Sequence, residues 1–271
     1  MSTRSALSSS AAALAALLAL SACGSGDDKP ADPAAAVPRI EAREYSYVLP
    51  RKVEGGVTSI EFANTGTQLH EFALGRLAPG ATLGQLRREL TDGDDQGPGE
   101  DVARDVGGVP ALSPGRRVTV TRKLEPGTYV VLCYIPGPDG KPHIEHGMID
   151  SFEVAGDTKQ APAKPDAVIV ARDKSFKVPR LNAGRQTIEL RNSAREEREF
   201  QIGSPEPGKK LPDVERWFDD GMRGPAPIDF PGGIQSIPAG ASVYQELELE
   251  AGRTYYLSDE HGLEARFTTS R

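Results

Sequence analysis

The chain has 271 residues, of which 39 are acidic and 32 are basic, so that its formal net charge is −7. This acidic balance argues against nucleic acid as a partner, because nucleic-acid binding requires a basic face. The length exceeds that of one typical domain. With 29 Gly and 22 Pro residues and little long-range helical periodicity, the composition favours an all-β protein with many turns.

The N-terminus has the three parts of an export signal: a short cationic start at Arg4, an apolar run from 11 to 20, and small residues before Cys23. The run is too short for a spanning helix, which needs roughly 20 residues. Leu20-Ser21-Ala22-Cys23 resembles the lipobox of bacterial lipoproteins. The resemblance implies that the signal peptide, 1–22, is removed and that Cys23 is acylated, which anchors the protein at the extracytoplasmic face of the cell membrane. The alternative is an ordinary cleaved signal that contains a cysteine.

Residues 23–38 are rich in Pro, Ala and Asp and are predicted to be a flexible tether.

The rest of the chain repeats one pattern. The matching segments are Glu44–Arg51 with Asp173–Arg180, Ser59–Asn64 with Thr187–Asn192, His70–Phe72 with Arg198–Phe200, and Tyr129–Cys133 with Thr254–Ser258. The offset changes only from 129 residues (Glu44 to Asp173) to 125 residues (Leu124 to Leu249). We therefore predict two copies of one domain, at 39–155 and 167–271, joined by a Pro/Ala/Lys-rich linker at 156–166.

Within each copy, short stretches of alternating apolar residues predict half-buried strands, for example at 58–62 and 118–124 in the first copy and 187–190 and 244–249 in the second. Each copy also contains one predicted helix. The first carries Leu83, Leu86 and Leu90 at helical spacing and ends near Gly93; the second starts near Pro212, has Val214, Trp217 and Phe218 as its apolar stripe, and ends near Gly221. We interpret both stripes, Trp217 included, as core packing.

The cysteine count points to a particular residue. If Cys23 is acylated, Cys133 has no partner within the chain. A thiol outside the cytoplasm is exposed to oxidation unless it is buried, crosslinked or bound to something. The simplest alternative is an inert, buried structural cysteine.

The residues around Cys133 resemble those of the cupredoxin family of small copper proteins. Asn64-Thr65-Gly66 precedes His70, and Cys133 is followed by His143 and Met148 before the last strand of the first copy. The pattern covers most of residues 40–154, and more weakly 165–269. It implies two tandem Greek-key β-sandwiches and one copper in the first, held by His70, Cys133, His143 and Met148. Two imidazoles, a thiolate and a weak axial thioether suit a copper ion that exchanges single electrons.

Two features depart from that family pattern. Nine residues separate Cys133 from His143, where familiar single-copper members have only a few, and His146 remains an alternative ligand. The second copy has Arg198 in place of His70 and Ser258 in place of Cys133, which excludes copper ligation through a thiolate there. The run Asp259, Glu260 and His261 could bind a cation, but we interpret it as a solvated turn.

Three functions are therefore compared. The leading prediction is a membrane-anchored copper-binding protein that transfers electrons or handles copper, with a redox or copper-accepting protein as partner. The alternative is a metal-free binding module in which paired sandwiches form a platform for a protein partner. A thiolate nucleophile activated by a histidine is the third possibility. The sequence has no Gly-Xaa-Ser-Xaa-Gly elbow, phosphate loop or His-Glu-Xaa-Xaa-His motif, and we predict that the protein is not an enzyme.

Overall fold

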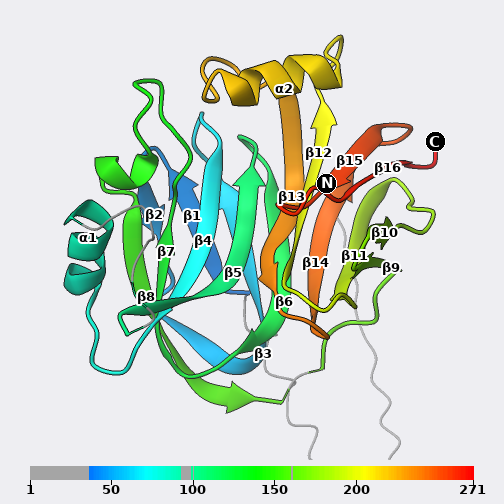
Figure 1. The fold of residues 1–271 in the computed structure, drawn as a ribbon. Coiled ribbons are helices and arrows are strands. Elements are labelled where there is room, and N and C mark those ends of the chain that lie inside the picture. Colours follow the sequence, from blue (N-terminus) through cyan, green and yellow to red (C-terminus); the bar gives the residue numbers. More distant parts are fainter. Residues whose placement is uncertain (1–36, 93–98, 100, 160) are drawn as a thin grey trace, which may run out of the picture. The chain divides into compact units, whose positions relative to one another are not determined.

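The computed structural model describes residues 37–92, 99, 101–159 and 161–271. The predicted signal peptide, the lipidation site Cys23 and nearly all of the tether lie outside these residues. Residues 37–271 form one compact unit, drawn as a ribbon in Figure 1. No helix within the described residues is long and apolar enough to cross a membrane.

In its described residues, the first copy contains eight strands, one α-helix and one 3₁₀ turn. They are β1 (Arg39–Arg43), β2 (Ser46–Val48), β3 (Lys52–Asn64), β4 (His70–Leu77), α1 (Leu83–Asp92), β5 (Ala103–Leu112), β6 (Arg117–Leu124), β7 (Gly127–Leu132), η1 (His143–His146) and β8 (Ile149–Thr158). The last strand reaches Thr158 and so runs into the segment whose composition predicts a linker.

The second copy repeats this order, apart from the 3₁₀ turn. Its elements are β9 (Ala167–Arg172), β10 (Ser175–Lys177), β11 (Gly184–Asn192), β12 (Arg198–Pro205), α2 (Leu211–Asp219), β13 (Ile228–Ile237), β14 (Ser242–Leu249), β15 (Thr254–Ser258) and β16 (Glu264–Thr268). The predicted all-β class, with one short helix in each copy, is confirmed.

Each copy is a sandwich of two layers. In the first, β2, β1, β3 and β6 form one layer and β8, β7, β4 and β5 form the other, and the two layers also meet where the first part of β3 pairs with β8. In the second, β10, β9, β11 and β14 face β16, β15, β12 and β13. Buried residues alternate along β6 and β14, as period-two patterning requires. Aromatic rings meet between the layers: Phe62 packs edge-on against Phe72, with ring centroids 5.2 Å apart.

The two copies share both layers. Strand β6 pairs with β14, and β5 pairs with β13, so hydrogen bonding continues from one copy into the other (Figure 1). In the β6–β14 pair, Val120 lies opposite Gln245, which is its own counterpart 125 residues later. The pairing is therefore symmetric about this point, as in a two-fold interface. Gln245 is fully buried, and its side-chain amide bonds both the N–H and the carbonyl of Gly233.

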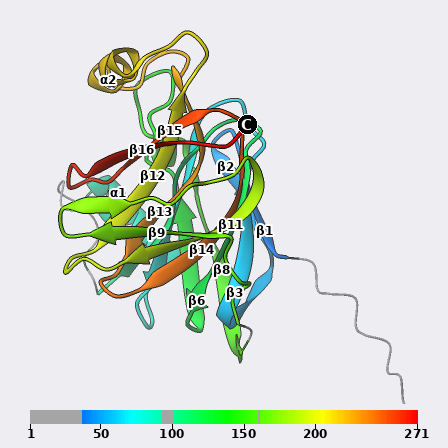
Figure 2. The ribbon, with the colours of Figure 1, turned by 90° about the vertical axis from the view of Figure 1, so that its right-hand side faces the viewer.

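The helices lie at different places on the two sandwiches. Helix α1 packs its Leu86 into a small cluster with Val130 and Ile149. Helix α2 lies beyond the ends of β12 and β13, as Figures 1 and 2 show. Its Val214 and Trp217 are buried as expected, whereas Phe218, predicted to belong to the apolar stripe, is 48% exposed. That prediction is wrong, because the α2 face that packs on the sandwich is too narrow to include the residue beside Trp217.

Candidate metal centre

His70 is positioned by a turn that Asn64 holds. Asn64 ends β3, and its side-chain oxygen accepts a bond from the N–H of Gly66. Its amide nitrogen donates to the carbonyls of Gln68 and Leu112, both at 2.8 Å. The turn thereby enters β4 at a fixed register, with His70 opposite Leu112 at the start of the strand. Gly66 is required here, because a Cβ at this position would lie 2.8 Å from Nε2 of His70.

Cys133 follows the last residue of β7 and is fully buried. Its Sγ accepts a hydrogen bond from the backbone N–H of Glu71 at 3.3 Å, and it lies 3.4 Å from Nδ1 of His143. Candidate ligand atoms of His70, Cys133 and His143 all lie within 4.8 Å of one another. These three predicted ligands therefore converge on one point inside the first sandwich.

The long segment between Cys133 and His143 forms a loop that is closed at its base by backbone hydrogen bonds. Pro136 and Pro142 form an isolated β-bridge, Gly137 donates to the carbonyl of Lys141, and His143 donates to the carbonyl of Ile135. The N–H of Ile144 then bonds the carbonyl of Cys133 at 2.9 Å. The chain thus leaves beside Cys133 and returns to the same place, and the nine-residue spacing does not separate the two ligands.

Met148 and His146 are placed differently. Met148 is fully buried in the same core as Cys133; its N–H donates to the carbonyl of His143, and its carbonyl accepts from the N–H of Cys133. His146 is exposed at the surface, where its Nε2 lies 3.2 Å from Asp139 and its ring packs on Tyr45. The structure therefore brings His143, and not the alternative His146, to Cys133.

A second group of residues supports the ligands. Oε1 of Gln68 lies 3.2 Å from Nε2 of His143, and Nε2 of Gln68 donates to the hydroxyl of Tyr45. Tyr45 in turn contacts the ring of His143 edge-on. Such contacts fix the orientation of a ligand ring and leave its Nδ1 free to coordinate. Sequence reasoning missed Gln68 and Tyr45, since no spacing rule links them to His143.

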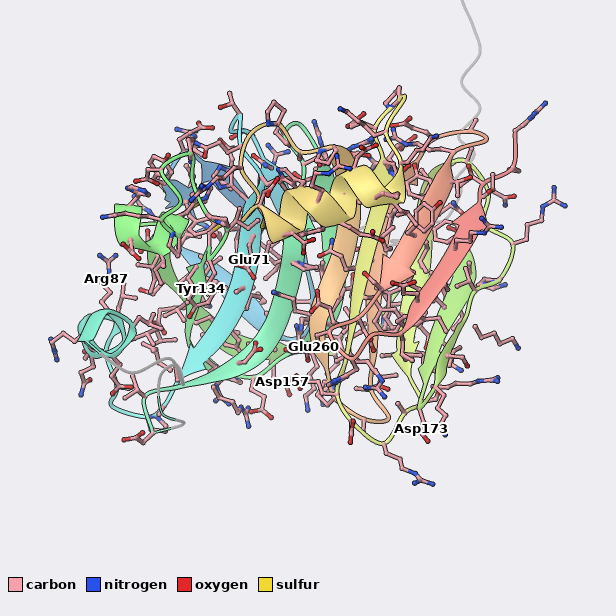
Figure 3. All side chains as sticks on the ribbon, turned by 45° about the horizontal axis from the view of Figure 1, so that its top comes forward. Glu71, Arg87, Tyr134, Asp157, Asp173 and Glu260 are labelled. Carbon is pink, nitrogen blue, oxygen red and sulfur yellow. The ribbon has the colours of Figure 1, made fainter. Side chains whose placement is uncertain are left out.

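Glu71 connects the centre to the second copy. Its carboxylate accepts from the N–H of Tyr134 and from the side chain of Gln235 on β13, and Figure 3 shows Glu71 and Tyr134 beside β4. Burial raises the pKa of this carboxyl to about 7. Sequence reasoning did not select Glu71, and the signal that could have pointed to it is its position directly after His70.

The protonation states of the three residues fit a metal. Burial lowers the pKa of His70 to about 4 and lowers the pKa of His143, so both imidazoles are neutral with a lone pair available. Burial raises the pKa of Cys133 to about 12, and the negative charge of Glu71 adds to this effect. A thiol in such a place ionises only when a cation binds beside it.

The ring of His70 gives the clearest test of the fit. Both of its nitrogens are buried and have no hydrogen-bond partner among the residues that the structure describes. An unpaired buried polar group costs about 1–3 kcal/mol, and a metal ion would satisfy one of the two nitrogens. Two imidazoles and a thiol, with a buried Met148 beside them, form a donor set that suits a single soft metal ion.

In the second copy an ion pair occupies the corresponding position. Arg198 begins β12 opposite Ile237, as His70 begins β4 opposite Leu112. Its buried guanidinium lies 3.6 Å from the carboxylate of Asp259, which follows Ser258. Asp259 also accepts from the N–H groups of His261 and Leu263, which makes the run 259–263 a hydrogen-bonded turn.

Comparison with known proteins gave matches only among solved structures. No family model and no curated protein matches the chain. A dithionite-reduced auracyanin from Roseiflexus castenholzii is 23% identical, with a TM-score of 0.30 over 43% of this chain and 94% of that one. The blue copper protein auracyanin A from Chloroflexus aurantiacus is 18% identical, with a TM-score of 0.27 over 43% and 99%. A multicopper oxidase is 17% identical, with a TM-score of 0.26 over 86% and 88%. The fit of the metal centre depends on the side chains described above and not on these likenesses.

Proposed function

We propose that this protein is a one-electron carrier in which His70, Cys133, His143 and Met148 of the first copy would hold a single copper ion. The observation that supports the proposal is the convergence of three buried donors, one of them a histidine with two unpaired nitrogens. Bound copper supplies the change between two oxidation states. The chain's own part is to hold the donors in place, to exclude water and to donate the N–H of Glu71 to the sulfur.

Electron transfer is favoured over the delivery of copper to another protein. His70, Cys133 and His143 are all fully buried. Handing a metal to a partner requires that ligands become accessible, whereas electron transfer requires a rigid, dry site that changes little between oxidation states. The hydrogen bonds that close the loop from Ile135 to His143 favour that rigidity.

The metal-free scaffold is the second candidate. In its favour, a protonated Cys133 can donate to Nδ1 of His143 at 3.4 Å, so that part of the site is satisfied without a metal. Against it, this arrangement leaves both nitrogens of His70 unpaired. We also propose that the protein has no catalytic activity of its own and exchanges electrons with a protein partner.

We further propose that the carrier works at the extracytoplasmic face of the cell membrane, anchored by acylation of Cys23. The support is the export signal and the lipobox-like sequence that ends at Cys23. Mass spectrometry of the mature N-terminus checks this: an unmodified Cys23, or cleavage elsewhere, would overturn it.

Titration of the copper-free chain with cupric ion tests the function. We expect an intense visible sulfur-to-copper absorption band that saturates at about one equivalent, as a single thiolate site requires. Cys133→Ser removes the sulfur and should abolish the band. His143→Ala should abolish or strongly shift it, while the matched variant His146→Ala should retain it. A colourless wild-type protein, or a band that survives Cys133→Ser, contradicts the proposal and favours the metal-free scaffold.

A further inference from the structure

A cavity of about 650 Å³ lies between the two copies, close to the metal centre. The first copy contributes the segments around Leu69, Ser113 and Pro136 to its wall. The second copy contributes Trp217 and the loop that follows α2, including Met222. Its volume is within the range of small-molecule sites, which is about 300–1,000 Å³.

Two residues that line this cavity also lie next to the imidazole of His143. Gln68 lines the cavity and is hydrogen-bonded to Nε2 of His143 at 3.2 Å. Gly137 lines it as well, and a Cβ on Gly137 would lie 3.5 Å from Cδ2 of the same imidazole. A molecule in the cavity would therefore contact Gln68 and Gly137, which in turn lie against a proposed copper ligand.

One side of the cavity is apolar and partly aromatic. Trp217 is 7% exposed and packs in a cluster with Leu69 and Ile228, against which Ile135 and Met222 also pack. The indole N–H is already directed to the carbonyl of Gly224. What Trp217 offers a ligand is therefore its ring, and aromatic rings pair favourably with one another beyond the area they bury.

The opposite side has a surplus of hydrogen-bond acceptors. Arg116 directs its guanidinium at Asp229 and Glu250, and Arg253 directs its own at Glu250 and Ser204. Glu206 also lines the cavity, with its carboxylate 3.9 Å from Arg253. Three carboxylates thus face two guanidiniums whose N–H groups are largely engaged. These side chains together carry a net negative charge. The carboxylate oxygens can accept further hydrogen bonds, so this side of the cavity suits a ligand that donates them.

We propose that this cavity binds a small aromatic molecule that carries hydroxyl or amino groups and is neutral or positively charged. The ring packs on Trp217, and the hydroxyl or amino group donates to the carboxylates around Glu206. Binding requires only the cavity. The role of the cavity, as the site where a small redox partner binds to the carrier, rests on the function proposed above.

The chain's single tryptophan provides the assay, because Trp217 lines the cavity. Tyramine is the probe, and 3-(4-hydroxyphenyl)propionate is its anionic counterpart with the same phenol ring. Both are titrated into the copper-free full chain and followed by Trp217 emission and by calorimetry. We expect tyramine to bind saturably at one equivalent, and the propionate to bind at least about tenfold more weakly, because it places a negative charge among carboxylates.

Three variants locate the site. Glu206→Gln should weaken tyramine binding about fivefold, which is the scale of a partly exposed charge pair. Glu215→Gln, on the exposed face of α2, is the matched control and should leave the affinity unchanged. Ala226→Phe fills the cavity and should abolish binding, with the far-UV spectrum and melting temperature checked to show that the variant is folded.

The outcomes separate this inference from the proposed function. Absence of saturable binding, equal binding of the two phenols, or full affinity in Ala226→Phe overturns the cavity proposal, whatever the copper titration shows. Saturable tyramine binding by a chain that gives no copper band would establish the site, while removing its connection to electron transfer.

Discussion

At the residue scale, the two copies show how one backbone position can hold different chemistry. The start of β4 carries the buried His70, and the start of β12 carries the buried Arg198. The Arg198 guanidinium is paired with Asp259, while His70 is neutral and its two nitrogens have no partner among the described residues. A buried cation excludes a second one beside it, so the arginine at this position makes the second copy unsuited to a metal ion.

Glu199 provides a prediction about pH. Burial raises its pKa to about 7, with smaller contributions from the neighbouring charges of Glu260, Glu71, Asp259 and Asp105. The folded state therefore holds this proton more tightly than the unfolded state, whose carboxyl has a pKa near 4.5. The resulting stabilisation is complete below about pH 4.5 and is lost as the pH rises through 7.

Glu199→Gln removes this dependence. Relative to the wild type, its free energy of unfolding should improve between pH 5 and pH 8 by about 1–3 kcal/mol, since each pKa unit corresponds to about 1.4 kcal/mol. Urea denaturation at several pH values measures the difference, with the exposed Glu215→Gln as control. A difference between Glu199→Gln and wild type that stays constant across this range would show that the carboxyl titrates normally.

The ligand residues were predictable because their types are rare and their spacing is informative. His70, Cys133 and His143 could be selected from a chain with four His and two Cys residues. The choice between His143 and His146 could not be made, because it depends on how the loop from Pro136 to Pro142 closes on itself. Gln68 could not be found either, since its role comes from a contact across 75 residues of sequence.

At the scale of elements, the two copies share a turn built on an asparagine. Asn64 bonds the N–H of Gly66 and the carbonyls of Gln68 and Leu112. Asn192 bonds the N–H of Ala194 and the carbonyls of Glu196 and Ile237 in the same pattern. Each side chain thus joins the end of one strand to the start of the next, but only the first turn leads to a proposed metal ligand.

Variants of these two asparagines can distinguish an effect on folding from an effect on metal binding. Asn64→Ala and Asn192→Ala should each lower the free energy of unfolding by about 2–4 kcal/mol, because each removes three hydrogen bonds, of which one is buried at Asn64 and two at Asn192. Only Asn64→Ala should also weaken copper binding, by about tenfold or more, since it loosens the segment that positions His70. Chemical denaturation and competition with a copper chelator provide the two measurements. Equal loss of copper affinity in both variants would mean that the effect is general destabilisation.

At the scale of the whole described unit, the joining of the two copies is the feature that sequence reasoning did not reach. The repeat and the strand patterns indicated two sandwiches, and these are present as elements in the same order. Nothing in a periodic pattern says that β6 pairs with β14, because Thr119 and Thr121 have the same alternation whether their strand is at an edge or inside a sheet. Gln245 is an exception to the apolar pattern, but its side chain bonds Gly233 of β13 in its own copy and so gives no sign of the pairing with β6.

Because both layers continue between the copies, we expect them to unfold together. Most of their buried apolar residues belong to one cluster, from Ile40 in the first copy to Phe267 in the second. Arg116 of the first copy also bonds Asp229 of the second through both carboxylate oxygens, at 3.0 and 2.7 Å, and the Asp229 side chain is only 6% exposed. Separating the copies would expose apolar surface and leave this carboxylate with Arg253 alone, at 3.8 Å.

Thermal unfolding of the copper-loaded protein can test this with one probe in each copy. The visible copper band reports on the first copy, and Trp217 emission reports on the second. Coincident transitions are expected, since two probes of one cooperative unit must agree. Arg116→Met should lower both midpoints together, through a loss of about 2–4 kcal/mol, because it removes two hydrogen bonds to a buried carboxylate and leaves it only Arg253 at 3.8 Å. Two separate transitions, or a shift of the Trp217 midpoint alone, would instead describe two copies that are stable independently, with the metal centre unaffected by its neighbour.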